Sequence, residues 1–284
     1  MTAPAQVLER GSADYPAALA ECSTAPARLW LRGDASLLRR RCIAIVGTRS
    51  ATAYGERIAH ALARALALAG ACVVSGLARG IDGAAHRGAL EAGGATIAVL
   101  GTGVDVVYPR GHAHLQATIA ERGLLVSELA PSNVAHGGSF PKRNRIIAAL
   151  SEVTVVVESP HKSGALITAA HALELGRTVA VVPGPIDIPQ AQGSNELLRD
   201  GAMPITSIAD AVTLLGLDVP LRAVDMPTEG AERRLWEALA GGPGDLDTLC
   251  ARAGLAVHDG MAAASALELR GIIQCALTGD IRRI

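Results

Sequence analysis

Six short apolar segments, rich in β-branched residues, constrain the fold of this chain more than any other feature. They are residues 42–47, 72–76, 96–101, 124–129, 153–158 and 178–184. Nearly continuous apolar runs of this length are typical of parallel strands buried on both faces. Amphipathic stretches of helical period lie between most of them, at residues 55–70, 82–94, 112–123 and 163–176. This alternation predicts an α/β fold with a doubly wound, mainly parallel sheet.

The alternation fades after residue 216, which indicates a second domain. Residues 217–229 have the proline and glycine content of a linker. The segment after them is predicted to form three helices and then a strand-turn-strand over residues 272–284, which is the order of a winged helix. We therefore expect an N-terminal lead-in (1–35), a sheet domain (36–216), the linker and a small C-terminal winged-helix domain (230–284).

Charge and cysteine content exclude several classes of protein. The chain has 26 Lys+Arg against 27 Asp+Glu, so any nucleic-acid surface must be a local patch. No apolar run approaches the roughly 20 residues that span a bilayer, and the N-terminus does not resemble a signal peptide, so we expect a cytoplasmic protein without a membrane partner. The five cysteines form no CxxC pair. Neither a disulfide framework nor a metal site is predicted.

Ligands of open parallel sheets bind outside the carboxyl ends of the strands, so the loops that follow the predicted strands are the candidate sites. The loop after the first strand, "GTRSATAYG", is glycine-rich but lacks the G-x-G-x-x-G spacing, and the second strand ends without an acid for a ribose. No cofactor is therefore predicted. Asp82 and His86 lie one helical turn apart; we interpret Asp82 as a helix cap with a nearby histidine, because a catalytic pair is the rarer arrangement.

Three of the chain's six aromatic residues lie in these loops, each within a few residues of Arg or Lys. They are Tyr54, Tyr108 and Phe140. The segment "GGSFPKRNRI" contains Phe140 and, just after it, Lys142, Arg143 and Arg145. Cations for phosphates and rings for bases are the composition of a groove for single-stranded nucleic acid. Two alternatives stay open: the rings pack the sheet edge beside solvated ion pairs, or Arg145 bridges to the core.

Several ordered motifs between about residues 15 and 211 resemble the DNA-processing protein A family, also called DprA or Smf. They include "VGTRSATAYG", "SGLARGIDGAAHRGAL", "FPKRNRIIAALS" and "SGALITAAHALELGR". The resemblance implies a Rossmann-like domain that binds single-stranded DNA, forms a homodimer and protects incoming DNA in natural transformation. It also implies loading of the RecA recombinase on strands coated by single-strand binding protein.

In that family, the arginine of the "GTR" turn and the cations of the "FPKRNR" segment line the DNA pocket. Ser163 is a predicted N-cap of the helix after the fifth strand, where free amides can receive a phosphate. The predicted DNA-binding residues are Gly47, Arg49, Tyr54, Phe140, Lys142, Arg143, Arg145, Ser163 and Gly164.

Two other functions fit the sequence less well. A similar core occurs in nucleotide-processing enzymes of the phosphoribohydrolase (lysine-decarboxylase-like) type, but their P-G-G-x-G-T-x-x-E motif is not reproduced by "PGPIDIPQAQGSNE". A winged-helix transcription factor would need more cations than Arg270, Arg282 and Arg283 to read a major groove. We therefore expect a DNA-binding protein and not an enzyme.

Overall fold

The computed structural model describes residues 4–217, 229–269, 272–276 and 279–283. The chain divides into two compact units, one within residues 1–220 and one within residues 221–284. Most of the predicted linker, residues 218–228, lies outside the described residues. The two units are described separately below.

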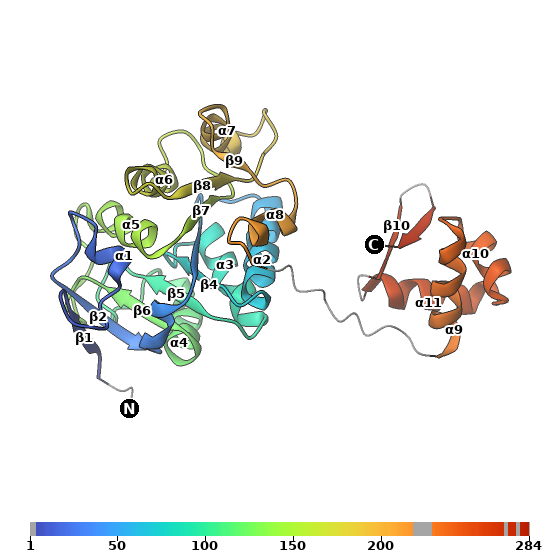
Figure 1. Cartoon of the computed structure of the whole chain (residues 1–284), viewed down its shortest axis with the longest axis horizontal. Coiled ribbons are helices and arrows are strands. Elements are labelled where there is room, and N and C mark those ends of the chain that lie inside the picture. Colours follow the sequence, from blue (N-terminus) through green and yellow to red (C-terminus); the bar gives the residue numbers. More distant parts are fainter. Residues whose placement is uncertain (1–3, 218–228, 270–271, 277–278, 284) are drawn as a thin grey trace. The chain divides into compact units, whose positions relative to one another are not determined.

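The first unit is built on a nine-stranded sheet of order β1-β2-β6-β5-β4-β3-β7-β8-β9 (Figure 1). Its strands are β1 (Gln6–Glu9), β2 (Arg28–Gly33), β3 (Cys42–Val46), β4 (Cys72–Ser75), β5 (Thr96–Val99), β6 (Leu124–Ser127), β7 (Val153–Val156), β8 (Thr178–Val181) and β9 (Met203–Pro204). The strands from β6 to β9 along the sheet are parallel, whereas β2 pairs antiparallel with both β6 and β1. The predicted α/β, mainly parallel, Rossmann-like sheet is therefore confirmed.

The strand order reverses between β3 and β7. From β3 the chain builds outward through β4, β5 and β6, and then returns to place β7 on the other side of β3. The carboxyl ends of two neighbouring strands thus lead to helices on opposite faces of the sheet. Such a switch point opens a crevice that commonly binds ligands.

Helices cover both faces of the sheet because side chains of the central strands alternate between two cores. Ala44 and Val46 of β3 pack in one core with helices α1, α5 and α6, and Ile43 and Ile45 pack in the other with α2, α3 and α8. The helices of this unit are α1 (Ala17–Ala20), α2 (Ala53–Leu68), α3 (Ile81–Glu91), α4 (Ala113–Arg122), α5 (Ser139–Leu150), α6 (Gly164–Glu174), α7 (Gln192–Arg199) and α8 (Ile208–Thr213). Burial on both faces explains why the strands are apolar throughout.

The second unit has the predicted order of a winged helix. Its elements are α9 (Gly230–Ala238), α10 (Leu246–Ala253), α11 (Val257–Leu269), β10 (Ile273–Cys275) and β11 (Ile281–Arg283). The two strands pair antiparallel, and the helices enclose a separate core that includes Leu235, Leu249 and Leu267. This small domain therefore has a core of its own.

Candidate nucleic-acid interface

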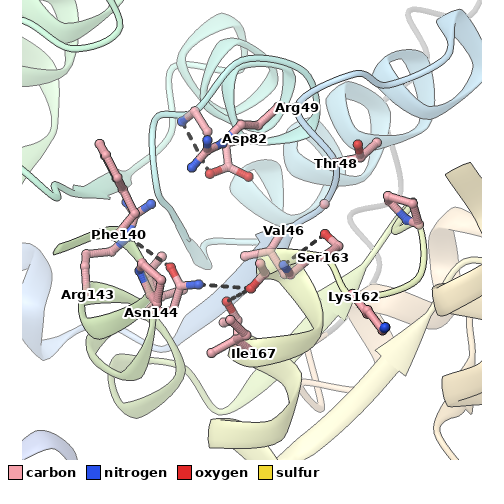
Figure 2. A pocket seen from close by; sticks show the side chains of 18 of the residues that line it. Val46, Thr48, Arg49, Asp82, Phe140, Arg143, Asn144, Lys162, Ser163 and Ile167 are labelled. Atoms are coloured by element: carbon pink, nitrogen blue, oxygen red, sulfur yellow. Dashed lines mark hydrogen bonds between the residues drawn. The ribbon is translucent and has the colours of Figure 1, made fainter. Parts of the chain in front are cut away.

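A cavity of about 430 Å³ lies at the switch point, between the loop after β3 and the loop after β7. We call it the switch-point cavity. Helix α5 closes one side and the first turns of α6 another, as Figure 2 shows. Its lining residues include six of the predicted set: Gly47, Arg49, Phe140, Arg143, Ser163 and Gly164. The structure thus brings together residues from three segments that are far apart in the sequence: the loop after β3, the start of α5 and the start of α6.

The turn that carries Arg49 is held by Glu158, at the end of β7. The backbone oxygen of Glu158 accepts a hydrogen bond from the Thr48 amide at 2.7 Å. Its buried carboxylate accepts from the amide and the hydroxyl of Thr52, the N-cap of α2. A Cβ atom at Gly55 would collide with this carboxylate, so the glycine provides the space for it. The exposed Arg49 side chain is therefore carried on a fixed turn.

Phe140 is the aromatic side chain of the switch-point cavity. Its ring packs so closely over Gly101 that a Cβ atom there would lie 2.5 Å from the ring. The Arg49 guanidinium lies 5.4 Å from the centre of the ring, and the Tyr108 ring lies 5.0 Å from it on a tilted contact. A cation beside an aromatic face is the arrangement that single-strand binding sites use for phosphate and base.

Residues 139–150 form the helix α5. Because of the helical period, the predicted cations of this segment lie on two different faces of the helix. Phe140, Arg143, Asn144 and Ile147, spaced as neighbours on one helix face, all line the switch-point cavity. Lys142 and Arg145 are on another face of α5. They line a different cavity of about 600 Å³ together with Glu128, Arg28 and His171, which we call the Lys142 cavity.

Arg145 is tied into the protein interior. Its guanidinium is within 2.8 Å of the Glu128 carboxylate and donates to the backbone oxygens of Thr24 and Lys142. Only 8% of its side chain is exposed. The structure thus fits the bridging alternative for Arg145. Lys142 approaches the same carboxylate at 3.7 Å but is 63% exposed, so its charge faces solvent.

Arg143 is also buried, although it lines the switch-point cavity. Its guanidinium donates to the carbonyl oxygens of Gly76 and Val99, at the ends of β4 and β5, and to the side-chain oxygen of Asn144. It lies so close to Gly76 that no Cβ would fit there. Burial lowers the pKa of Arg143 to about 10, partly offset by the negative charge of Asp82. Arg143 therefore fastens α5 to the carboxyl ends of two strands.

Asp82 is not the helix cap that the sequence predicted. The N-cap of α3 is Gly80, whose φ of 71° favours glycine. Asp82 lies in the first turn, where its carboxylate accepts hydrogen bonds from the amides of Gly76 and Ala78. Burial raises its pKa and the Arg143 guanidinium opposes that rise. His86 bonds to Thr96 and not to Asp82, so the structure does not form a catalytic pair from them.

The N-terminal end of α6 opens on the switch-point cavity. Ser163 is its N-cap, as predicted, and accepts a hydrogen bond from the Ala165 amide. Lys162 precedes it with a φ of 58°, rare for a residue with a side chain, and lines the cavity. Within the described residues, neither Lys162 nor Arg49 makes a hydrogen bond or an ion pair. Two uncompensated cations and a helix N-terminus thus face one cavity, which suits an anionic ligand.

Tyr54 does not reach the switch-point cavity. It lies in the first turn of α2, 39% exposed, and its ring packs under Arg57 of the same helix at 5.5 Å. Conversely, Lys162 belongs to the cavity but was not among the predicted binding residues. The signal that could have identified it is its position directly before a serine N-cap in a strand-end loop.

Among the residues that the structure describes, no group of three or more His, Cys, Asp or Glu side chains is placed to hold a metal ion. In the same part of the chain, no helix is both long enough and apolar enough to cross a bilayer.

Comparison with known proteins identifies the family. The model of the family described as DNA recombination-mediator protein A matches residues 6–216, and that of the DprA winged helix domain matches residues 220–276. The chain belongs to the DNA recombination-mediator protein A family. The proteins to which this chain is compared are therefore members of this family, also called DprA or Smf.

Among curated members, a putative DNA processing protein DprA of Mycobacterium tuberculosis is 42% identical over 265 residues, covering 89% of this chain and 68% of the relative. The DNA processing protein DprA of Bacillus subtilis is 43% identical over 200 residues, covering 70% and 67%. The solved DprA of Streptococcus pneumoniae superposes with a TM-score of 0.71 at 38% identity, covering 74% of each chain. DNA processing protein A of Helicobacter pylori, whose structure concerns its single-stranded DNA binding mode, gives 0.69 at 34% identity and covers 75% of this chain and 96% of its own.

Proposed function

We propose that this chain binds single-stranded DNA in the switch-point cavity and acts as a non-enzymatic recombination mediator. The observation that supports the proposal most directly is the convergence of Arg49, Lys162 and Phe140 on one cavity. Two cations without acidic partners suit backbone phosphates, and a ring held against Gly101 suits a base. The Helicobacter pylori relative, for which single-stranded DNA binding is described, supports the same ligand.

The proposed contacts extend beyond this cavity. Gly164 lines it with open space where a Cβ would be, so a strand can approach the backbone closely there. Gly47 is proposed to contact the strand through its backbone, because a Cβ there would point at Ile81 and Glu158 and not into the cavity. Ser163 holds the helix end that faces the phosphate. Lys142, on the other face of α5, is proposed to contact a strand that continues past the cavity. The charge of Arg145 is already used by Glu128, so we expect its contribution to be structural.

The family also suggests the biological setting. We propose that the protein protects incoming DNA during natural transformation and promotes loading of the RecA recombinase on strands coated by single-strand binding protein. A homodimer is the proposed assembly. Analytical ultracentrifugation tests the dimer, and a strand-exchange assay with and without the protein tests recombinase loading. A monomer at all concentrations, or unchanged strand exchange, would contradict these two parts separately.

The DNA-binding part is tested by fluorescence anisotropy with matched single-stranded and double-stranded oligonucleotides over a range of salt concentrations. We expect tighter binding to the single strand. Arg49→Gln and Lys162→Gln should each reduce the salt slope by about 0.7, the value for one phosphate contact on a single strand. Phe140→Leu should cost about 1 to 3 kcal/mol of binding with an unchanged slope.

The matched control is Arg87→Gln. Arg87 is an exposed arginine of α3 that lines neither the switch-point cavity nor the Lys142 cavity. It should bind as the wild type does. Equal affinity for single and double strands, or a salt slope that does not change in the Arg49 and Lys162 variants, would refute the proposal.

A further inference from the structure

A second, small cavity of about 60 Å³ adjoins the switch-point cavity and shares Phe140 with it. We call it the Tyr108 cavity. Its floor is formed by the buried Leu77 and Leu100, and Tyr108 and Arg79 lie on its rim. None of its described lining residues is acidic. It therefore combines an apolar floor, an aromatic ring and a cation.

Tyr108 is held in an exposed position by its neighbours. The residue is 45% exposed, and its ring contacts the Phe140 ring, with the two centres 5.0 Å apart and the planes inclined by 34°. The buried Gln116 of α4 fixes the backbone behind it: the amide oxygen accepts from the Tyr108 amide at 3.3 Å, and the amide nitrogen donates to the Val106 carbonyl at 3.1 Å. A large ring is thus kept partly in solvent on a braced turn.

Arg79 is an exposed cation on an equally braced turn. The Ala78 amide donates to the Asp82 carboxylate, and the Leu77 carbonyl accepts from His112 at 3.1 Å. Within the described residues, Arg79 itself makes no hydrogen bond and no ion pair. Most other arginines of this unit do have partners, as Arg41 has in Glu152. An unpaired arginine beside an exposed ring is a combination that the stability of the fold does not require.

We propose that the Tyr108 cavity is a second nucleotide subsite, in which the next base of the strand stacks on Tyr108 and its phosphate contacts Arg79. The proposal rests on the proposed function of the switch-point cavity and extends it. Because the Tyr108 and Phe140 rings already touch, no base fits between them. The strand therefore passes over the pair, with one base against Phe140 in the switch-point cavity and the following base against Tyr108.

The contacts of the second subsite do not depend on the identity of the base. Every base has a π-face that can stack on a ring, and the only charged partner is a phosphate oxygen. The Tyr108 cavity is too small to enclose a base, so its edge stays in solvent and is not read. The second subsite therefore adds affinity and directs the strand, without adding sequence preference.

The experiment measures anisotropy with homothymidine strands of about 4 to 16 nucleotides, the range of single-strand site sizes. Tyr108→Leu should weaken binding by about 5-fold to 150-fold, the loss of one stacked base, with an unchanged salt slope. Tyr108→Phe keeps the ring and should bind as the wild type does. Arg79→Gln should reduce the salt slope by about 0.7, and Arg87→Gln should not change it.

Arg79 provides a test that does not act through the Phe140 ring, because the structure records no contact between them beyond the shared cavity. Wild-type affinity of Tyr108→Leu together with a wild-type slope of Arg79→Gln overturns the second subsite. If Phe140→Leu and Arg49→Gln still weaken binding in that case, the proposed function stands. If the wild-type protein binds no single strand, both fail together. Equal melting temperatures establish that each variant is folded.

Discussion

Arg143 offers the sharpest test of how the structure divides the cations of the "FPKRNR" segment. Arg143→Met removes the charge and the donors but keeps much of the apolar length. In the folded protein, the carbonyls of Gly76 and Val99 lose their shared donor, and the buried Asp82 carboxylate loses the positive charge that opposes its pKa rise. We therefore expect a loss of stability and not only of affinity.

The magnitude follows from this environment. Removing one member of a buried, hydrogen-bonded charge arrangement typically destabilises a protein by about 3 to 5 kcal/mol. For a domain of this size, that corresponds to a fall in melting temperature of roughly 6 to 20 °C. Asp82→Asn should cost less in the Arg143→Met background than in the wild type, because the carboxylate is then already unopposed.

Calorimetry or thermal unfolding by circular dichroism measures the first effect, and a salt titration of DNA binding below the melting transition measures the second. We expect a lower melting temperature with a nearly unchanged salt slope. The reverse pattern, a melting temperature within about 2 °C of the wild type and a slope reduced by about 0.7, would show that Arg143 binds a phosphate and would refute the structural role.

Three further predictions follow from other parts of the molecule. Burial lowers the pKa of His86 to about 3, below its usual 6.5. The unfolded chain therefore binds a proton that the folded protein does not, and the free energy of unfolding should fall by about 1.4 kcal/mol for each pH unit between about 6.5 and 3. Urea unfolding at pH 7 and pH 5 should show a smaller pH effect in His86→Leu. Gly101→Ala should displace the Phe140 ring, which lies 2.5 Å from the added Cβ, and should weaken DNA binding. Gly111→Ala adds a Cβ in open space and should leave the affinity unchanged; fluorescence anisotropy measures the affinity of both variants. Deleting residues 221–284 should leave a folded first unit that binds single strands, because the second unit has its own core; aggregation of the truncated chain would contradict this.

The sequence was sufficient for the core of the sheet but not for its edges. The six predicted strands occur at β3 to β8, because burial on both faces leaves a continuous apolar signal. Strands β1 and β2 were not predicted. β1 is a four-residue edge strand with a mostly exposed sequence, and β2 alternates exposed and buried residues over only six positions. β2 pairs with β6, which is remote in sequence, and β1 pairs with β2. The local sequence pattern does not contain that information.

The site was predicted in part for a similar reason. The loops that follow the strands could be located from the strand pattern, and Arg49, Phe140 and Ser163 follow predicted strands and line the switch-point cavity. From its place after the fourth predicted strand, Phe140 was expected in a loop, but α5 begins at Ser139 and has Pro141 in its first turn. Proline is compatible with the first turn of a helix, where its missing amide hydrogen has no partner to lose. Once residues 139–150 are helical, Lys142 and Arg145 must lie on a different face from Phe140 and Arg143.

A protein with a formal net charge of -1 can still bind a polyanion if the cations in one part of its surface have no acidic partners. Away from the switch point, several cations face acids: Arg41 lies 2.7 Å from Glu152, and Arg145 lies 2.8 Å from Glu128. Around the two adjoining cavities, Arg49, Lys162 and Arg79 have no such partner within the described residues. Because screening limits charge effects to about 10 Å at ordinary salt, a strand responds to these nearby cations and not to the net charge. A strand bound there also keeps its bases accessible to the rings, which a paired duplex does not allow.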